Sequence, residues 1–193
     1  ASEDSLMSSL LSRRSVPALL LGPPGPSDQQ IDAALQAAAH APDHGALRPW
    51  RFVLIRAPEA RARLADLFVA RMLERDPSIP PGKVDKARHM PRTAPLVIGV
   101  AAHVTSGHKV PELEQLLATG AAVMNLLNAF HAQGYGAIWL TGANGYDPEI
   151  GTQLGFEAGE RSLGFVYVGT PQGALRDGPP RPEPISFARE WRG

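Results

Sequence analysis

The sequence predicts one domain of the α+β or α/β class, with a sheet of about four or five strands. The chain has 193 residues, an ordinary size for a single domain, so we expect one domain over residues 1–193. Helix-like and strand-like segments are interleaved along it. The longest helix-like segment, residues 111–133, is apolar on nearly every side. This pattern predicts a central helix that is buried by the sheet and by a second subunit.

The helices are predicted from apolar spacing and from capping residues. Ser27 followed by Gln30 is a capping-box pattern, which predicts a helix that continues to about His40. The proline-rich stretch at 76–82 is expected to be a break, and Pro91 and Pro95 are expected to end the basic helix that follows it. A second turn-rich stretch, GPPGPS at 22–27, is expected to be a connection. The other expected helices cover residues 4–12, 58–75 and 147–155.

The strands are predicted from alternation or from continuous apolar runs. Residues 50–56, WRFVLIR, have a strand-like pattern, whereas residues 95–102 are apolar throughout and are therefore expected to form a buried strand. Residues 135–140 and 163–170 are the further strand candidates. The tail from Gly178 is rich in proline, so we expect it to be extended and arm-like.

The composition excludes several classes of protein. Hydrophobic residues make up 44% of the chain, charged residues 20%, and the formal net charge is zero. A balanced charge argues against nucleic acid as the main partner. The absence of cysteine excludes disulfide scaffolds and thiolate chemistry. No apolar run is long enough to cross a membrane and no signal peptide is visible, so the cytoplasm is the expected location.

Most motifs that carry known chemistry are missing. Gly134 and Gly136 begin a GxGxxG-like pattern, but Trp139 stands where the third glycine belongs and the pattern precedes a strand. His103 and His108 are weak candidates for metal ligands, and we expect no metal site. Glu112 and Glu114 lie in the first turn of the long helix, where carboxylates complement the positive end of the helix dipole.

Three short stretches remain as candidates for a site. Arg13, Arg14 and Ser15 end the first helix and can bind an anion; the alternative is a solvated helix end. In the stretch 39–52, His44 lies in a rigid turn and Arg48, which precedes a proline, is expected to be extended. Residues 136–145 end a strand with glycines that let the backbone approach a flat ligand. Each of these stretches is also compatible with an ordinary structural role.

Together the stretches resemble the FMN-dependent nitroreductase family, and most of all its short YdjA-type subgroup of NAD(P)H nitroreductases. The motifs occur in the same order, and the similarity extends from about Leu6 to Pro171. They are RRS at 13–15, APDH and RPW.F between 41 and 52, HKVPELEQ at 108–115, AVM at 122–124, GYGAIW..G from 134 and GF.Y.GTP from 164.

The resemblance implies an α+β fold with a mainly antiparallel sheet, and a homodimer with FMN at the subunit interface. It implies that Arg13, Arg14 and Ser15 hold the FMN phosphate and ribityl chain. His40 and His44 of the other subunit would lie along the flavin, and Trp139, Leu140 and Thr141 would line it. The segment that would contact NAD(P)H comprises Ala129, Phe130, His131, Ala132, Gln133 and Gly134.

The implied activity is a ping-pong oxidoreductase reaction. Hydride would pass from NAD(P)H through flavin N5 to a small oxidised acceptor, such as a nitroaromatic compound or a quinone. Because the flavin does the chemistry, no catalytic acid–base residue is expected. Two alternatives remain open: a flavin-binding protein with a storage or sensing role, and a flavin-fragmenting or dehalogenating enzyme on the same fold.

The chain departs from the family pattern at several positions. The family commonly has a lysine near flavin N1 where this chain has Val16 and Pro17, and Arg48 is the candidate to replace it. The subgroup has arginine where this chain has His40 and Leu140. The basic, proline-rich segment 76–93 is a candidate lid over the site.

Overall fold

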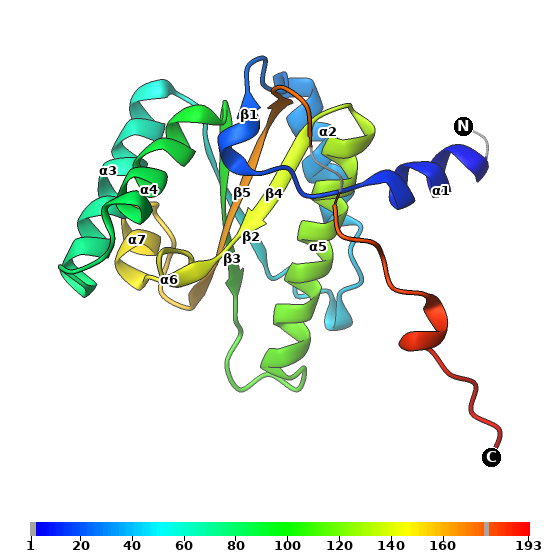
Figure 1. Cartoon of the computed structure of the whole chain (residues 1–193). Coiled ribbons are helices and arrows are strands. Elements are labelled where there is room, and N and C mark those ends of the chain that lie inside the picture. Colours follow the sequence, from blue (N-terminus) through cyan, green and yellow to red (C-terminus); the bar gives the residue numbers. More distant parts are fainter. Residues whose placement is uncertain (1–2, 176–177) are drawn as a thin grey trace.

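The structure, a computed structural model, describes residues 3–175 and 178–193. It has three layers, with a five-stranded sheet between two pairs of helices (Figure 1). Helices α2 (Asp28–Ala39) and α5 (Glu112–Ala132) cover one face. Helices α3 (Pro58–Arg75) and α4 (Pro81–Thr93) cover the other. The α+β class predicted from the sequence is therefore confirmed.

The sheet has the strand order β1-β5-β3-β2, and β4 also pairs with β5. Every ladder between these strands is antiparallel. The strands are β1 (Leu21–Gly22), β2 (Trp50–Ile55), β3 (Leu96–His103), β4 (Gly136–Leu140) and β5 (Glu160–Pro171). The long strand β5 therefore organises the sheet, because it pairs with three of the other four.

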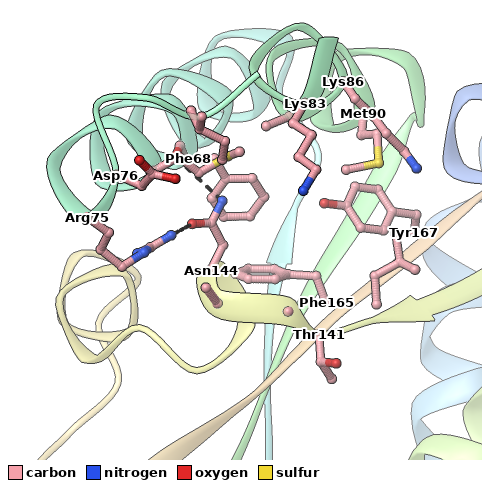
Figure 2. A pocket seen from close by; sticks show the side chains of 16 residues that line it. Phe68, Arg75, Asp76, Lys83, Lys86, Met90, Thr141, Asn144, Phe165 and Tyr167 are labelled. Atoms are coloured by element: carbon pink, nitrogen blue, oxygen red, sulfur yellow. Dashed lines mark hydrogen bonds between the residues drawn. The ribbon is translucent and has the colours of Figure 1, made fainter. Parts of the chain in front are cut away.

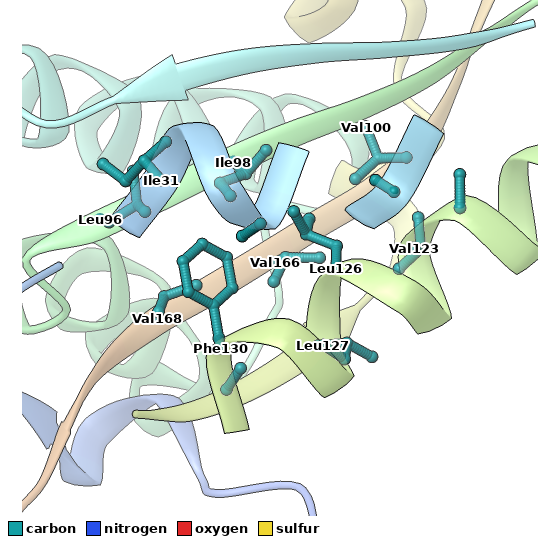
Figure 3. Packing of buried hydrophobic residues seen from close by; sticks show 14 of the residues in the cluster. Ile31, Leu96, Ile98, Val100, Val123, Leu126, Leu127, Phe130, Val166 and Val168 are labelled. Carbon is teal, nitrogen blue, oxygen red and sulfur yellow. The ribbon is translucent and has the colours of Figure 1, made fainter. Parts of the chain in front are cut away.

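Alternation along β3 and β5 divides the interior into two cores. Ile98 and Val166 face α2 and α5, where Leu126 and Phe130 pack against them (Figure 3). Val97 and Tyr167 point to the opposite face, toward α3 and α4. Because successive side chains of a strand point to opposite faces, one buried strand supplies both cores. The continuous apolar run of β3 is explained in this way.

The predicted capping box at the start of α2 is confirmed. The backbone N–H of Gln30 donates to the Ser27 hydroxyl at 3.3 Å, and the backbone N–H of Ser27 donates to the Gln30 side chain at 2.9 Å. Two backbone donors at the helix start are satisfied in this way.

One expectation about the connections is incomplete and another is wrong. Residues 22–27 are not only a turn, because Leu21 and Gly22 pair with Pro171 and Thr170 as strand β1. Pro91 lies within α4, which continues to Thr93. The guanidinium of Arg61 on α3 donates to the carbonyls of Arg92 at 2.6 Å and Ala94 at 2.8 Å. This contact stabilises a last turn that the sequence alone predicts to be broken.

The remaining helices are short, and some of them differ from the expected ones. The predicted helix at 147–155 is present as α7, and β5 begins at Glu160, three residues before the expected start. The short helix α6 was not expected from the sequence. These elements are α1 (Glu3–Ser12), η1 (Ala18–Leu20), η2 (His44–Ala46), α6 (Gly142–Gly145), α7 (Pro148–Gln153) and η3 (Pro184–Ser186).

Large apolar side chains are exposed on α1, α5 and the C-terminal tail. In Figure 1 these three segments lie on the same side of the molecule, away from α3 and α4. The side chains concerned are Leu6, Met7, Leu10 and Leu11 on α1, Leu113, Leu117 and Met124 on α5, and Ile185, Phe187 and Trp191 in the tail. Among the described helices, none is long and apolar enough to cross a membrane.

Candidate functional site

The candidate site is built along strand β4. At the start of this strand, Ser15 forms a parallel bridge with Ala137, and the backbone N–H of Val16 donates to the Ala137 carbonyl at 3.0 Å. The segment that follows α1 is thereby fixed against β4. Arg13 and Arg14 are half-buried at this point. Arg14 and Ser15 border a depression of about 430 Å³ with Pro17, Leu20, Ala174 and Leu175.

Arg13 lies near a second arginine, Arg181. Burial, and then the nearby charge of Arg181, lower the pKa of the Arg13 guanidinium. The Arg181 guanidinium also donates to the Arg13 carbonyl at 3.5 Å. Within residues 3–175 and 178–193, no ion pair of Arg13 with a carboxylate is found. A guanidinium in this setting can donate hydrogen bonds to an anionic group.

At the other end of β4 is a cavity of about 510 Å³, which we call the β4 cavity (Figure 2). It lies between α3, α4 and the loop that follows β4. Its walls are largely aromatic and aliphatic, and the rings of Phe68 and Phe165 pack edge to face at 4.8 Å. Its lining residues are Phe68, Met72, Arg75, Asp76, Ile79, Lys83, Lys86, Ala87, Met90, Leu140, Thr141, Gly142, Ala143, Asn144, Phe165 and Tyr167.

The three residues that were expected to line the flavin, Trp139, Leu140 and Thr141, do not all line the same cavity. Leu140 and Thr141 line the β4 cavity. Trp139 packs in the core on the α2 and α5 face, and its indole N–H donates to the Leu163 carbonyl at 2.8 Å. The alternation of side chains along a strand separates Trp139 from Leu140. Trp139 therefore has no contact with the β4 cavity.

Two polar side chains of the β4 cavity were not expected as site residues. Tyr167 is 2% exposed, and burial raises the pKa of its phenol. Lys83 comes from α4 and directs its ammonium group into the cavity, as Figure 2 shows. The sequence held one signal for Tyr167. It lies between Phe165 and Gly169 on one face of β5 and is the polar side chain among these three.

The rim of the cavity is held by a buried carboxylate. Asp147 is 4% exposed, and its Oδ2 atom accepts from Arg71 Nε at 2.9 Å and also from Arg75. Arg75 donates to the Asn144 side chain as well. Burial opposes ionisation of Asp147, but hydrogen bonds from Arg71 and the backbone outweigh it and hold the pKa below its usual value. This network fixes the loop after β4 to α3.

The stretch between α2 and β2 is shaped by its own hydrogen bonds. Arg48 has φ +48°, so the expectation of an extended Arg48 is wrong. Its backbone N–H donates to the Asp43 carboxylate at 2.7 Å, and its carbonyl accepts from Arg51 at 2.8 Å. These two contacts hold a conformation that is costly for a residue with a side chain.

The two histidines of this stretch are exposed and lie outside the β4 cavity of their own chain. His40 is the C-cap of α2. His44 Nδ1 lies 2.6 Å from Glu114 Oε2 at the start of α5. Glu112, in the same helical turn, pairs with Arg161. The first-turn carboxylates of α5 therefore have specific partners in addition to their favourable position at the helix start.

The segment from Ala129 to Gly134 is only partly accessible. Phe130 is fully buried in the core, so its side chain is closed off from any nucleotide. Gln133 donates from its side chain to the Gln30 carbonyl at 3.0 Å, and His131 Nε2 lies 3.0 Å from the Ser12 hydroxyl. His131 and Gly134 border a depression of about 350 Å³ that Arg14 also lines. Among the described residues, no group of three metal-ligating side chains occurs.

The comparisons with known proteins identify the family. The Nitroreductase family model matches residues 10–170. The Escherichia coli K12 protein named "Putative NAD(P)H nitroreductase YdjA" is 37% identical over 182 residues, which are 92% of this chain and 94% of that protein. The chain therefore belongs to the nitroreductase family.

Solved structures show the same fold. A nitroreductase-like family protein from Bacillus cereus superposes with a TM-score of 0.84 at 21% identity, over 100% of this chain and 99% of that chain. A Desulfovibrio desulfuricans structure described as "a putative nitroreductase in complex with fmn" superposes with a TM-score of 0.72 at 23% identity, over 98% of both chains. The expected nitroreductase-like fold is therefore confirmed.

Proposed function

We propose that this chain is an FMN-dependent NAD(P)H oxidoreductase that reduces small oxidised acceptors. The observation that carries the proposal is the layout of strand β4. Arg13, Arg14 and Ser15 lie at its start, and Leu140 and Thr141 open into the β4 cavity at its end. The family membership and the names of the relatives support the same activity.

The residues at the start of β4 suit a phosphate group. Arg13 is half-buried, and among the described residues Arg181 is the charged neighbour that shifts its pKa. Ser15 follows two residues later and borders the depression that Arg14 also lines. Guanidinium groups donate pairs of hydrogen bonds to phosphate oxygens. An anionic ligand would therefore relieve the repulsion between Arg13 and Arg181.

The residues at the end of β4 suit a flat aromatic ring. Ala137 and Leu140 are three residues apart, which in a strand is about 10 Å. A ribityl chain bridges a comparable span between a phosphate and a ring. Gly142 has φ +68° and open space where a side chain would lie, so its backbone can approach a ring closely. The apolar walls of the β4 cavity exclude water from that ring.

Bound FMN would supply the redox chemistry, taking hydride from NAD(P)H and passing it to the acceptor in a separate half-reaction. The chain's own residues would bind the phosphate, orient the ring and shield it from water. Within the segment proposed for NAD(P)H, His131 and Gly134 border the depression that Arg14 also lines. The Phe130 side chain has no place in this part of the proposal.

We also propose that the active form is a homodimer. Leu113 and Leu117 on α5 are 65% and 62% exposed, and further apolar side chains of α1 and the tail lie on the same side. Exposed apolar patches of this kind are typical of subunit interfaces. In the dimer, His40 and His44 of one subunit would approach the flavin of the other.

A visible spectrum of the purified protein, followed by anaerobic titration with NADH and NADPH, tests the proposal. The expected result is a flavin spectrum that is bleached by one of the nucleotides and restored by a nitroaromatic compound or a quinone. Protein that binds FMN but is not bleached by either nucleotide would instead support a storage or sensing role. Protein that takes up no FMN would refute the proposal.

A further inference from the structure

The β4 cavity contains a buried phenol without a hydrogen-bond partner. Tyr167 is 2% exposed, yet none of the hydrogen bonds among the described residues involves its hydroxyl. Among the described residues, the fully buried side-chain atoms that lack a partner belong to His103, Asn128 and Gln133. The Tyr167 oxygen is not one of them, so it is in contact with the open space of the cavity. In Figure 2 this hydroxyl points into the cavity from β5.

A second polar group, the Lys83 ammonium, reaches the same cavity as the Tyr167 hydroxyl. The Lys83 side chain crosses from α4 and places its ammonium group in the same space (Figure 2). In the described part of the chain, no carboxylate lies within 4 Å of this ammonium group; Asp76 acts on it only at longer range. The cavity wall beside the two groups is largely apolar and aromatic and includes Phe165 and Met90, while the Lys83 side chain as a whole is exposed.

A hydroxyl without a hydrogen-bond partner is costly in such surroundings, whereas the exposed Lys83 side chain keeps its ammonium group accessible to water. Phenylalanine would fill the position of Tyr167 equally well if packing were its only role. A ligand that brings a hydrogen-bond acceptor into the cavity removes this cost. The ligand must be flat enough to lie between aromatic walls and must carry an acceptor on its edge.

We infer that the Tyr167 hydroxyl donates a hydrogen bond to a carbonyl oxygen on the pyrimidine edge of bound FMN, with the Lys83 ammonium as the cation at that edge. This inference rests on the proposed function. Burial raises the pKa of the Tyr167 phenol, which keeps it protonated and able to donate at neutral pH. Donors at this edge stabilise the negative charge that the ring gains on reduction, and so raise its potential. They would replace the cation that Val16 and Pro17 do not provide.

The test compares Tyr167→Phe with Tyr146→Phe, because Tyr146 is 59% exposed and lies outside the β4 cavity. The apoprotein of Tyr167→Phe is expected to melt at the same temperature as the wild type or higher, because the hydroxyl has no protein partner to lose. Its FMN dissociation constant is expected to rise about two- to tenfold, the range for one lost hydrogen bond. The flavin absorption band is expected to shift and the midpoint potential to fall. Tyr146→Phe is expected to match the wild type in all four measurements.

A second pair of variants tests the cation. Lys83→Met is expected to weaken FMN binding roughly tenfold or more, as for a lost charge-assisted contact, and to lower the midpoint potential. Lys109→Met, at an exposed lysine in the loop before α5, is the matched control and is expected to change neither.

Several results would overturn the inference. Equal FMN affinity, spectrum and potential in Tyr167→Phe and the wild type would do so, as would a change confined to the KM of the acceptor. A clearly lower melting temperature of the Tyr167→Phe apoprotein would show a structural role for the hydroxyl. In these cases the wild type still binds FMN and the proposed function stands, whereas a wild type that binds no FMN would refute both.

Discussion

His44 Nδ1 lies 2.6 Å from the Oε2 atom of Glu114, and this contact ties the stretch before β2 to the first turn of α5. The two side chains are 64% and 44% exposed. A side-chain contact so exposed contributes little to stability. The pair instead orients the imidazole on the side of the molecule where α5 exposes Leu113 and Leu117. This position is suited to contact with a second subunit.

Replacing His44 by alanine is expected to change the free energy of unfolding by less than about 1 kcal/mol. If His44 approaches the flavin of the partner subunit, the variant should alter the flavin absorption band and the rate of reduction by NAD(P)H in stopped-flow measurements. His103→Ala, on β3, is the control and should alter neither. Identical spectra and rates for His44→Ala and the wild type would remove His44 from the site.

Arg13→Ala is expected to weaken FMN binding by about 1.5–3 kcal/mol, because it removes a charge-assisted contact to the phosphate. Titration of the apoprotein with FMN, followed by fluorescence quenching, measures the loss. Arg63→Ala, at an exposed position of α3, should bind FMN as the wild type does. Unchanged affinity of the Arg13 variant would show that the anion site lies elsewhere.

Because of Asp147, the free energy of unfolding is expected to depend on pH in the acidic range. Because its folded-state pKa is lowered, its contribution is present above its ordinary pKa of 3.8 and is lost as the pH falls through the folded value. Asp147→Asn is expected to lower the free energy of unfolding at pH 7 by about 2 kcal/mol or more, since two arginines lose a buried carboxylate. The difference between variant and wild type should shrink below pH 3.8 in denaturant titrations.

The control for this variant is Asp28→Asn, at a side chain that is 81% exposed and paired with Arg56. Its effect should stay below about 1 kcal/mol at every pH. A difference between Asp147→Asn and the wild type that does not depend on pH would contradict the role assigned to the ionised carboxylate.

Gly164 lets the loop after β4 pack against β5. A Cβ atom at this position would lie 2.4 Å from the Leu140 carbonyl oxygen, and the backbone has φ +102°. Gly164→Ala is therefore expected to destabilise the fold by roughly 3 kcal/mol or more. Gly155→Ala is the matched control, because Gly155 has φ +85° but open space around it, and should cost only about 1 kcal/mol. Thermal unfolding of both variants measures the difference, and equal losses would show that the close approach is unimportant.

Leu117→Glu is expected to convert the proposed dimer into a monomer, because it places a charge in the apolar surface of α5. Light scattering gives the mass of each species. Leu73→Glu is the control: Leu73 is 40% exposed on α3, on the opposite side of the molecule, and the variant should remain dimeric. A wild type that is monomeric while it holds flavin would refute the dimer proposal.

The sequence by itself determined the type of most elements. The capping box at Ser27, the apolar run at 95–102 and the long apolar helix near 111–133 each carry their own local signal, and each is present in the structure. Such signals work because hydrogen bonding and side-chain direction repeat over a few residues in helices and strands. The family was also indicated by the sequence, because its motifs are short segments that can be recognised without knowing the tertiary contacts.

Only the tertiary structure decided what depends on partners distant in the chain. Pro91 stays helical because Arg61, thirty residues earlier, binds the last carbonyls of α4. Arg48 adopts a positive φ because Asp43 and Arg51 hold both of its backbone groups. Trp139 and Leu140 are adjacent in sequence, yet the sheet sends them to opposite faces. The sequence marks Tyr167 only as a polar residue on an apolar face of β5. The open space beside its hydroxyl exists because α3 and α4 pack over that face, which the tertiary structure alone decides.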